Sequence, residues 1–139
     1  MWGRRRGLNL VDTPDMDAFF DRLEQLNQAE MMSLSASCNA SDRRAREDAW
    51  TSVKAIGARD GLSSEIARVR DRAQAFVSRA SDLVPLYGLN NGDLWLQAKG
   101  RAGEAIVDAA LAVALGDRLD TAARDVLLGP WLCATETLG

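Results

Sequence analysis

The stretch that decides the fold is Ala105 to Gly116, AIVDAALAVALG, which contains ten apolar residues, one aspartate and a final glycine. Twelve helical residues span about 18 Å, well short of the ~30 Å hydrocarbon core of a bilayer, so a membrane segment is excluded here. A helix that is apolar on nearly all sides is typically surrounded by other helices. The stretch therefore predicts the central helix of a bundle.

The one charge in this stretch, Asp108, belongs to a narrow polar stripe. Gln97, Arg101, Glu104 and Asp108 step along the helix by four, three and four residues. Glu104 and Asp108 repel each other mildly, and Arg101 can offset that repulsion. The spacing predicts that Asp108 lies at the solvent edge, while the core positions are Ile106, Ala109 and Val113. A buried Asp108 that faced an arginine of another helix would instead become the first residue to test for function.

C-terminal to Asp108, the helix face that carries the polar stripe continues without charge through Leu111 and Leu115. An uncharged face at one end of a helix is a candidate for contact with a partner, so we expect an interaction surface there. Trp131 is a second candidate, because tryptophan is enriched among the residues that dominate binding at protein interfaces.

Helical spacing and cap signals predict further helices on both sides of the central one. Thr13 and Pro14 read as an N-cap and a first helical residue. Gly57 and Gly61 frame an exit turn after a second helix, which Ser41 caps if the chain breaks near Asn39. Gly129 and Pro130 kink or end the last helix. The predicted ranges are 13–27, 42–57, 63–84 and 94–116, followed by a last helix that starts near 121 and kinks or ends at 129–130.

No run of alternating β-branched residues and no internal repeat occurs in the chain, so a sheet is not expected. The predicted fold is all-α, a compact bundle of four to five helices, mostly antiparallel, in a single domain. We expect residues 1–12 to form a flexible basic arm and residues 13–139 to form the bundle. Whether residues 35–41 are a loop or part of one long helix stays open.

The composition argues against most catalytic chemistry. The chain has no histidine, which removes the commonest general base and metal ligand near neutral pH. Asp17 and Asp21, four residues apart, could share a cation, but no second acidic cluster closes a metal cage. We therefore predict no catalytic, cofactor-binding or metal-binding residue. Cys38 and Cys133 are expected as reduced, partly buried thiols, and their sequence separation leaves open whether they meet.

The charges are unevenly distributed, although the net charge is only −3. The predicted helix at 63–84 carries Arg68, Arg70 and Arg72, which permits a helix-turn-helix interpretation. Acidic residues interrupt the same helix, and Arg68 and Arg72 can instead pair with the acidic first helix. We therefore do not expect nucleic acid as a partner. The abundance of arginine over lysine suggests a GC-rich bacterial source.

The sequence leads to one principal functional hypothesis and two alternatives. The principal one is a small, cytoplasmic, non-catalytic helical protein that acts through protein partners, itself included as a homodimer, in a regulatory or accessory role. The alternatives are a bundle that binds a small ligand and a DNA-associated regulator using the arginine-rich helix 63–84. No membrane association is expected. The candidate interaction residues are Leu111, Leu115, Trp131, Arg68 and Arg72.

Overall fold

The computed structural model describes residues 10–26, 29–30, 33–34, 36–37, 42–80 and 92–136, with side chains omitted at 79–80, 92–102 and 136. Its helices are α2 (Pro14–Glu24), α4 (Arg43–Asp60), α5 (Ser63–Ala80), α6 (Gly92–Leu115), the short 3-10 helix η1 (Gly116–Arg118) and α7 (Thr121–Glu136). The described residues contain no strand, so the predicted all-α bundle is confirmed. Asn39 and the expected break beside it lie outside the described residues.

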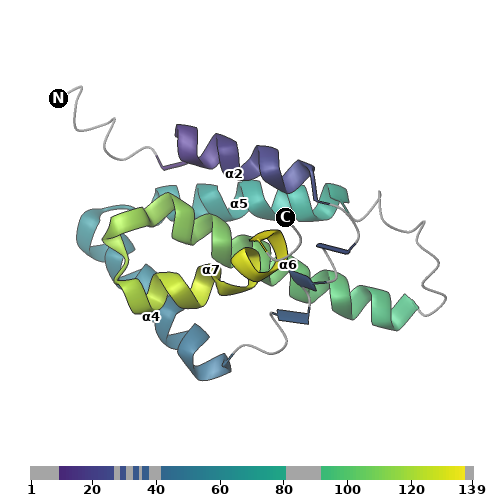
Figure 1. Ribbon diagram of the computed structural model, residues 1–139. Coiled ribbons are helices and arrows are strands. Elements are labelled where there is room, and N and C mark those ends of the chain that lie inside the picture. Colours follow the sequence, from purple (N-terminus) through teal and green to yellow (C-terminus); the bar gives the residue numbers. More distant parts are fainter. Residues whose placement is uncertain are drawn as a thin grey trace.

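The helix α6 is the centre of the arrangement (Figure 1). It packs against α2, α5 and α7, and α4 packs against α5 and α7. The C-terminal half of α6 is enclosed: Ile106, Ala109, Ala110 and Leu111 are each at most 1% exposed. Ile106 and Ala109 are thus core residues as predicted, and Val113 is a partly buried residue packed against the core. Burial on several sides explains why this stretch carries so little polarity.

The helix starts follow from local capping. Thr13 Oγ1 accepts a hydrogen bond from Met16 N at 3.1 Å, as its position before Pro14 predicts. Asp42, not Ser41, caps α4, and its Oδ1 accepts from Arg44 N at 2.9 Å. Asp120 Oδ1 accepts from Ala123 N at 2.7 Å at the start of α7. Side-chain acceptors at these positions satisfy amide donors that the helix itself leaves unpaired.

One predicted helix end was wrong, and an alternative left open by the sequence is decided at a second. We expected α4 to end at Gly57, but the helix continues to Asp60, and Gly61 ends it in the left-handed region at φ 66°. Gly57 serves helix packing instead, because a Cβ there would lie 3.0 Å from Ile66 Cδ1. At Gly129 and Pro130, where the sequence predicted either a kink or an end, α7 does not end but continues to Glu136. A helical residue before proline suffers a clash through its Cβ, and Gly129 has none.

Substitution of Gly61 tests the left-handed end of α4. We expect Gly61→Ala to lower the free energy of unfolding by about 1 kcal/mol, because alanine is disfavoured at positive φ. Asparagine tolerates this region better, so Gly61→Asn should cost clearly less. Urea unfolding of both variants measures the difference. Equal stability of Gly61→Ala and the wild type would contradict this account, since no neighbour lies within 4 Å of a Cβ there to compensate.

The N-terminal boundary also differs from the prediction in part. Leu10 and Val11, which we placed in the flexible arm, are 3% and 7% exposed and belong to the hydrophobic core. Leu10 N donates to Glu65 Oε2 at 3.4 Å, and Arg72 Nη1 donates to Val11 O at 3.0 Å. These bonds join the segment before α2 to α5. Residues 1–9 lie outside the described residues.

Candidate functional site

Asp108 is buried, contrary to the prediction that it lies at the solvent edge of α6. It is 3% exposed, and its carboxylate is engaged by two side chains of α4. Oδ2 accepts from Arg46 Nε at 2.6 Å, and Oδ1 accepts from Arg46 Nη2 at 3.0 Å and from Trp50 Nε1 at 2.9 Å. The bidentate pair with Arg46 is the strong geometry for an arginine and a carboxylate. This Asp108 cluster, Asp108 with Arg46 and Trp50, joins α6 to α4.

The compensation for the Glu104 and Asp108 repulsion therefore comes from another helix. Arg46 Nη1 lies 3.8 Å from Glu104 Oε2, so one guanidinium faces both carboxylates. Glu104 stays more than half exposed, whereas Asp108 does not. The two acids were correctly predicted to share a stripe. The arginine expected to balance them, Arg101, has a side chain outside the described residues.

The charge state of Asp108 reflects its burial. Desolvation raises the pKa of the Asp108 carboxyl, although the hydrogen bonds from Arg46 and Trp50 act to lower it. The nearby Glu104 carboxylate raises this pKa further. The folded protein consequently favours the protonated form of Asp108 more than the unfolded chain does.

This shift has a measurable sign. Because the folded pKa is above the ordinary value of 3.8, the stability that Asp108 contributes is greatest below that pH. The part of this stability that depends on protonation of Asp108 is lost as the pH rises through the folded pKa. We expect urea unfolding between about pH 4 and pH 7 to show the wild type losing stability relative to Asp108→Asn, which has no titrating group at this position. If the difference in free energy of unfolding between the two proteins stays constant over this pH range, or if the wild type gains stability relative to the variant, the expectation is contradicted.

The Asp108 cluster holds Trp50 at the edge of a groove between α4 and α5. The groove has a volume of about 220 Å³. Val53, Gly57 and Ile66 are buried residues that line it. Trp50 and Arg70 line it from the two helices, and the Arg70 guanidinium lies 5.5 Å from the centre of the Trp50 ring. The hydrogen bond from the indole N–H to Asp108 fixes the orientation of the Trp50 ring, which borders the groove.

Lys54 and Ala67 also line this groove, and both are exposed. The Lys54 side chain forms no hydrogen bond or ion pair within the part of the chain that the structure describes. Arg70 contacts the Trp50 ring but has no carboxylate partner among the same residues. The groove thus combines an apolar floor, an aromatic wall and two cations. Tryptophan and arginine are the residues that most often dominate binding at interfaces.

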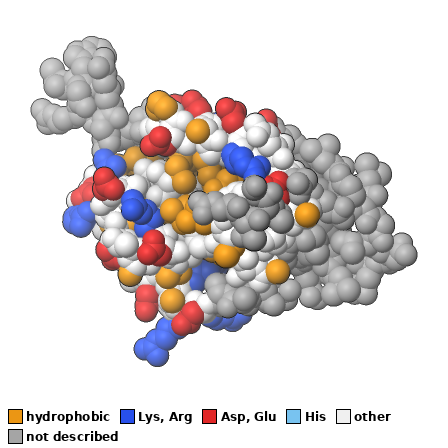
Figure 2. Space-filling model, in the orientation of Figure 1, with side chains coloured by type: hydrophobic (Ala, Val, Ile, Leu, Met, Phe, Trp, Pro, Cys, Tyr) orange, Lys and Arg blue, Asp and Glu red, His pale blue; other side chains and the backbone are white. Residues whose placement is uncertain are grey.

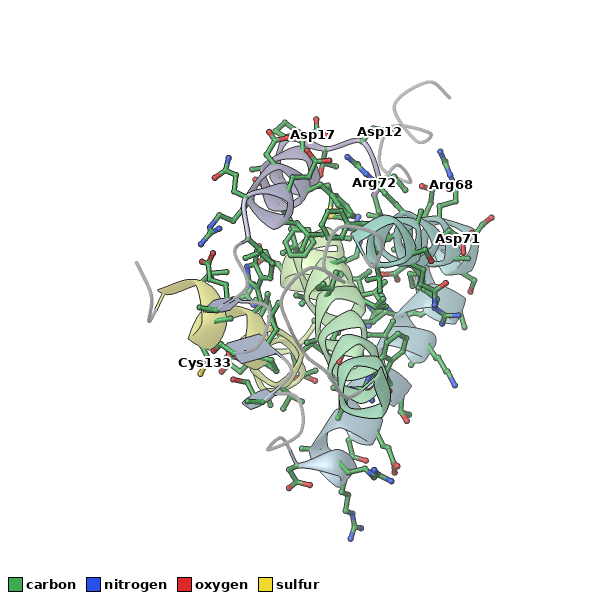
Figure 3. All side chains as sticks on the ribbon, turned by 90° about the vertical axis from the view of Figure 1, so that its right-hand side faces the viewer. Asp12, Asp17, Arg68, Asp71, Arg72 and Cys133 are labelled. Atoms are coloured by element: carbon green, nitrogen blue, oxygen red, sulfur yellow. The ribbon has the colours of Figure 1, made fainter. Side chains whose placement is uncertain are left out.

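Arg68 and Arg72 of α5 are engaged within the chain. Arg68 Nη1 pairs with Glu65 Oε1 at 3.1 Å on its own helix. Arg72 Nη2 lies 3.7 Å from Asp17 Oδ1 of α2, and the Arg72 guanidinium lies 4.1 Å from the centre of the Phe20 ring. Figure 3 shows Arg72 extending from α5 toward α2 and Asp17. The pairing with the acidic first helix holds for Arg72 but not for Arg68.

The remaining predicted interaction residues lie in the core. Leu111 is 0% and Leu115 is 1% exposed, because neighbouring helices enclose the C-terminal end of α6 as fully as its middle. Trp131 is 7% exposed and packs against Phe19, with ring centres 4.6 Å apart. A partner could reach Leu111 or Leu115 only if the helices separated. We therefore no longer place the interaction surface at this end of α6.

Figure 2 shows one face of the molecule, on which hydrophobic side chains gather near the middle and charged side chains surround them. The most exposed large apolar residue among those described is Leu132 of α7, at 40%. Cys133 beside it is exposed rather than partly buried as predicted, and Cys38 lies outside the described residues. A single exposed leucine is ordinary on a protein surface and marks no site by itself.

The described residues show neither a metal-binding cluster nor a membrane-spanning helix. There, no group of three or more acidic or cysteine side chains is placed to hold a metal ion. Of the helices in these ranges, none combines the length and the apolarity needed to cross a bilayer. Every buried side-chain nitrogen or oxygen of the described residues has a hydrogen-bond partner, so no orphaned polar atom points to a missing ligand.

Comparisons of the chain with protein-family models, with curated proteins and with solved structures found no match, so the candidate site rests on its own geometry.

Proposed function

We propose that this protein is a small non-catalytic helical protein that acts through protein–protein contact, in a regulatory or accessory role, and that the α4–α5 groove is its contact surface. The observation that carries the proposal is the position of Trp50. Its indole N–H is held by the buried Asp108, while its ring borders an open groove beside Arg70. A binding surface gains affinity when its aromatic side chains are fixed before the partner arrives.

The two alternative functions have less support. A pocket for a small ligand normally has a volume of about 300–1,000 Å³. The α4–α5 groove, at about 220 Å³, is smaller than that. A DNA-reading helix needs free arginines, but Arg68 is paired with Glu65, and Arg72 with the N-terminal segment. Of the three arginines that suggested this alternative, only Arg70 has no carboxylate or carbonyl partner among the described residues. Self-association stays within the principal proposal, although it no longer rests on Leu111 and Leu115.

Site-specific photo-crosslinking tests the contact surface. A photoreactive amino acid is placed at Ala67, which is exposed and lines the groove, and in a second variant at Ala122, which is exposed on α7. In cells of the source organism we expect a discrete crosslinked adduct from position 67 and none from position 122. Mass spectrometry of the adduct then distinguishes a separate partner from a second copy of the chain. Equal labelling from both positions, or none from position 67, would refute the proposed surface.

A further inference from the structure

The chemistry of the α4–α5 groove indicates what kind of partner it accepts. The floor is formed by Val53 and Ile66, which are 1% and 7% exposed and are apolar. Gly57 lets α4 and α5 approach closely at one end of the groove, because a Cβ there would lie 3.0 Å from Ile66 Cδ1 and 3.1 Å from Ser63 Oγ. A groove of about 220 Å³ with such a floor matches one large apolar side chain and is too small for a whole helix.

The groove is also cationic. Lys54 and Arg70 lie on opposite helices and line the same space. Neither has a carboxylate partner within the described ranges. Elsewhere on these two helices Arg46 pairs with Asp108, Arg59 with Asp60 and Arg68 with Glu65. Arg43 and Arg44, at the exposed start of α4, also have no carboxylate partner among the described residues, but they do not line the groove. Lys54 and Arg70 differ from them because both face the same groove. The two unpaired cations therefore favour an acidic partner by charge complementarity.

We propose that the α4–α5 groove binds an acidic segment of a separate protein, which inserts one large apolar side chain between Trp50 and Ile66 and sets Asp or Glu residues against Lys54 and Arg70. This inference rests on the proposed function and adds the chemistry of the partner. A second copy of the chain fits less well. The acidic helix α2 carries Asp15, Asp17 and Asp21 on its surface, but its phenylalanines are buried in its own core. Its acids therefore come without an apolar side chain to insert.

Selection from a phage-displayed library of random dodecapeptides against the whole purified chain tests this inference. We expect the enriched peptides to combine Leu, Phe or Trp with Asp or Glu within one helical turn. A synthetic, fluorescently labelled copy of an enriched peptide is then titrated by anisotropy. The double variant Lys54→Gln and Arg70→Gln should bind it about tenfold more weakly, as expected for two exposed ion pairs, and raised salt should have a similar effect on the wild type.

The matched control removes the same charge from the same region. Arg43 and Arg44 are exposed at the start of α4 and do not line the groove. The double variant Arg43→Gln and Arg44→Gln should bind the peptide as the wild type does. An equal loss in both double variants would show that only the net charge matters, and would overturn the proposed pairing with Lys54 and Arg70.

The failures of the two proposals can be separated with Trp50→Ala, once circular dichroism shows that the variant is folded. The enriched peptides could lack acidic residues and still bind the Trp50→Ala variant more weakly than the wild type. That result would overturn the acidic partner and would retain the groove as the contact surface. Peptides that bind Trp50→Ala as well as the wild type, or no enrichment at all, would overturn both. A dimer in light scattering that the Lys54 and Arg70 variant abolishes would overturn the separate partner in favour of a second copy.

Discussion

Replacement of Asp108 by alanine should lower the free energy of unfolding by about 2–4 kcal/mol. The substitution removes the acceptor of three hydrogen bonds and leaves Trp50 Nε1 and the Arg46 guanidinium without it. Removal of one partner of a buried ion pair is costly because the other charge is left uncompensated. Arg46 is 28% exposed and can recover some hydration, which sets our estimate below the range for a fully enclosed pair. Urea or thermal unfolding measures the loss.

A double variant separates the role of the charges from the role of packing. Arg46→Met combined with Asp108→Leu replaces the ion pair by apolar side chains, and buried pairs replaced in this way often keep their stability. We expect the double variant to lie within about 1 kcal/mol of the wild type, and Asp108→Leu alone to be clearly less stable. If Asp108→Ala unfolds at the same urea concentration as the wild type, the cluster does not hold α4 to α6.

Replacement of Phe19 by alanine should cost about 3–4 kcal/mol, because a phenylalanine truncated in a core loses its burial and leaves a cavity. Phe19 is 5% exposed. Its ring lies 5.3 Å from that of Phe20 in a T-shaped arrangement and 4.6 Å from that of Trp131. The contact with Trp131 joins α2 to α7, so we expect α2 to detach first. Urea unfolding, followed by circular dichroism and by the fluorescence of the four tryptophans, measures the loss.

The control for this substitution is Phe19→Leu, which keeps most of the apolar volume and should cost no more than about 1.5 kcal/mol. A double-mutant cycle with Trp131→Leu then isolates the aromatic contact, for which we expect about 0.5–1.5 kcal/mol of coupling. Additive effects of the two substitutions would show that the rings contribute through their burial alone. A cost below about 1.5 kcal/mol for Phe19→Ala would mean that α2 is not anchored by this residue.

The sequence was sufficient for features that depend on neighbouring residues. The Thr13 cap and the burial of Ile106 and Ala109 follow from spacing within one helix, and the structure confirms them. Gly57 and Gly61 look alike in the sequence but have different roles in the structure. Both are glycines near the end of α4, but only Gly61 has a positive φ, and Gly57 is required by Ile66 of the next helix.

The candidate site depended on contacts that spacing cannot supply. Asp108 and Glu104 share a polar stripe, which is typical of a solvent edge. Arg46, however, lies 62 positions earlier in the chain and reaches Asp108 from another helix. Helical periodicity assigns a residue to a face of its own helix and does not say what covers that face. The same limit explains Leu111 and Leu115, whose uncharged face is covered by other helices rather than left for a partner.

The enclosed half of α6 has a further consequence for how the chain finds its fold. Its buried surface includes Ala105, Ala109, Ala110 and Ala112. Alanine ridges are shallow, so these alanines by themselves discriminate only weakly against a helix shifted by one turn, about 5.4 Å. The carboxylate of Asp108 has its three donors in one register only, and in every shifted arrangement a charge would be buried without them. Asp108 therefore raises the energy of the misaligned bundles and widens the gap that separates them from the native one.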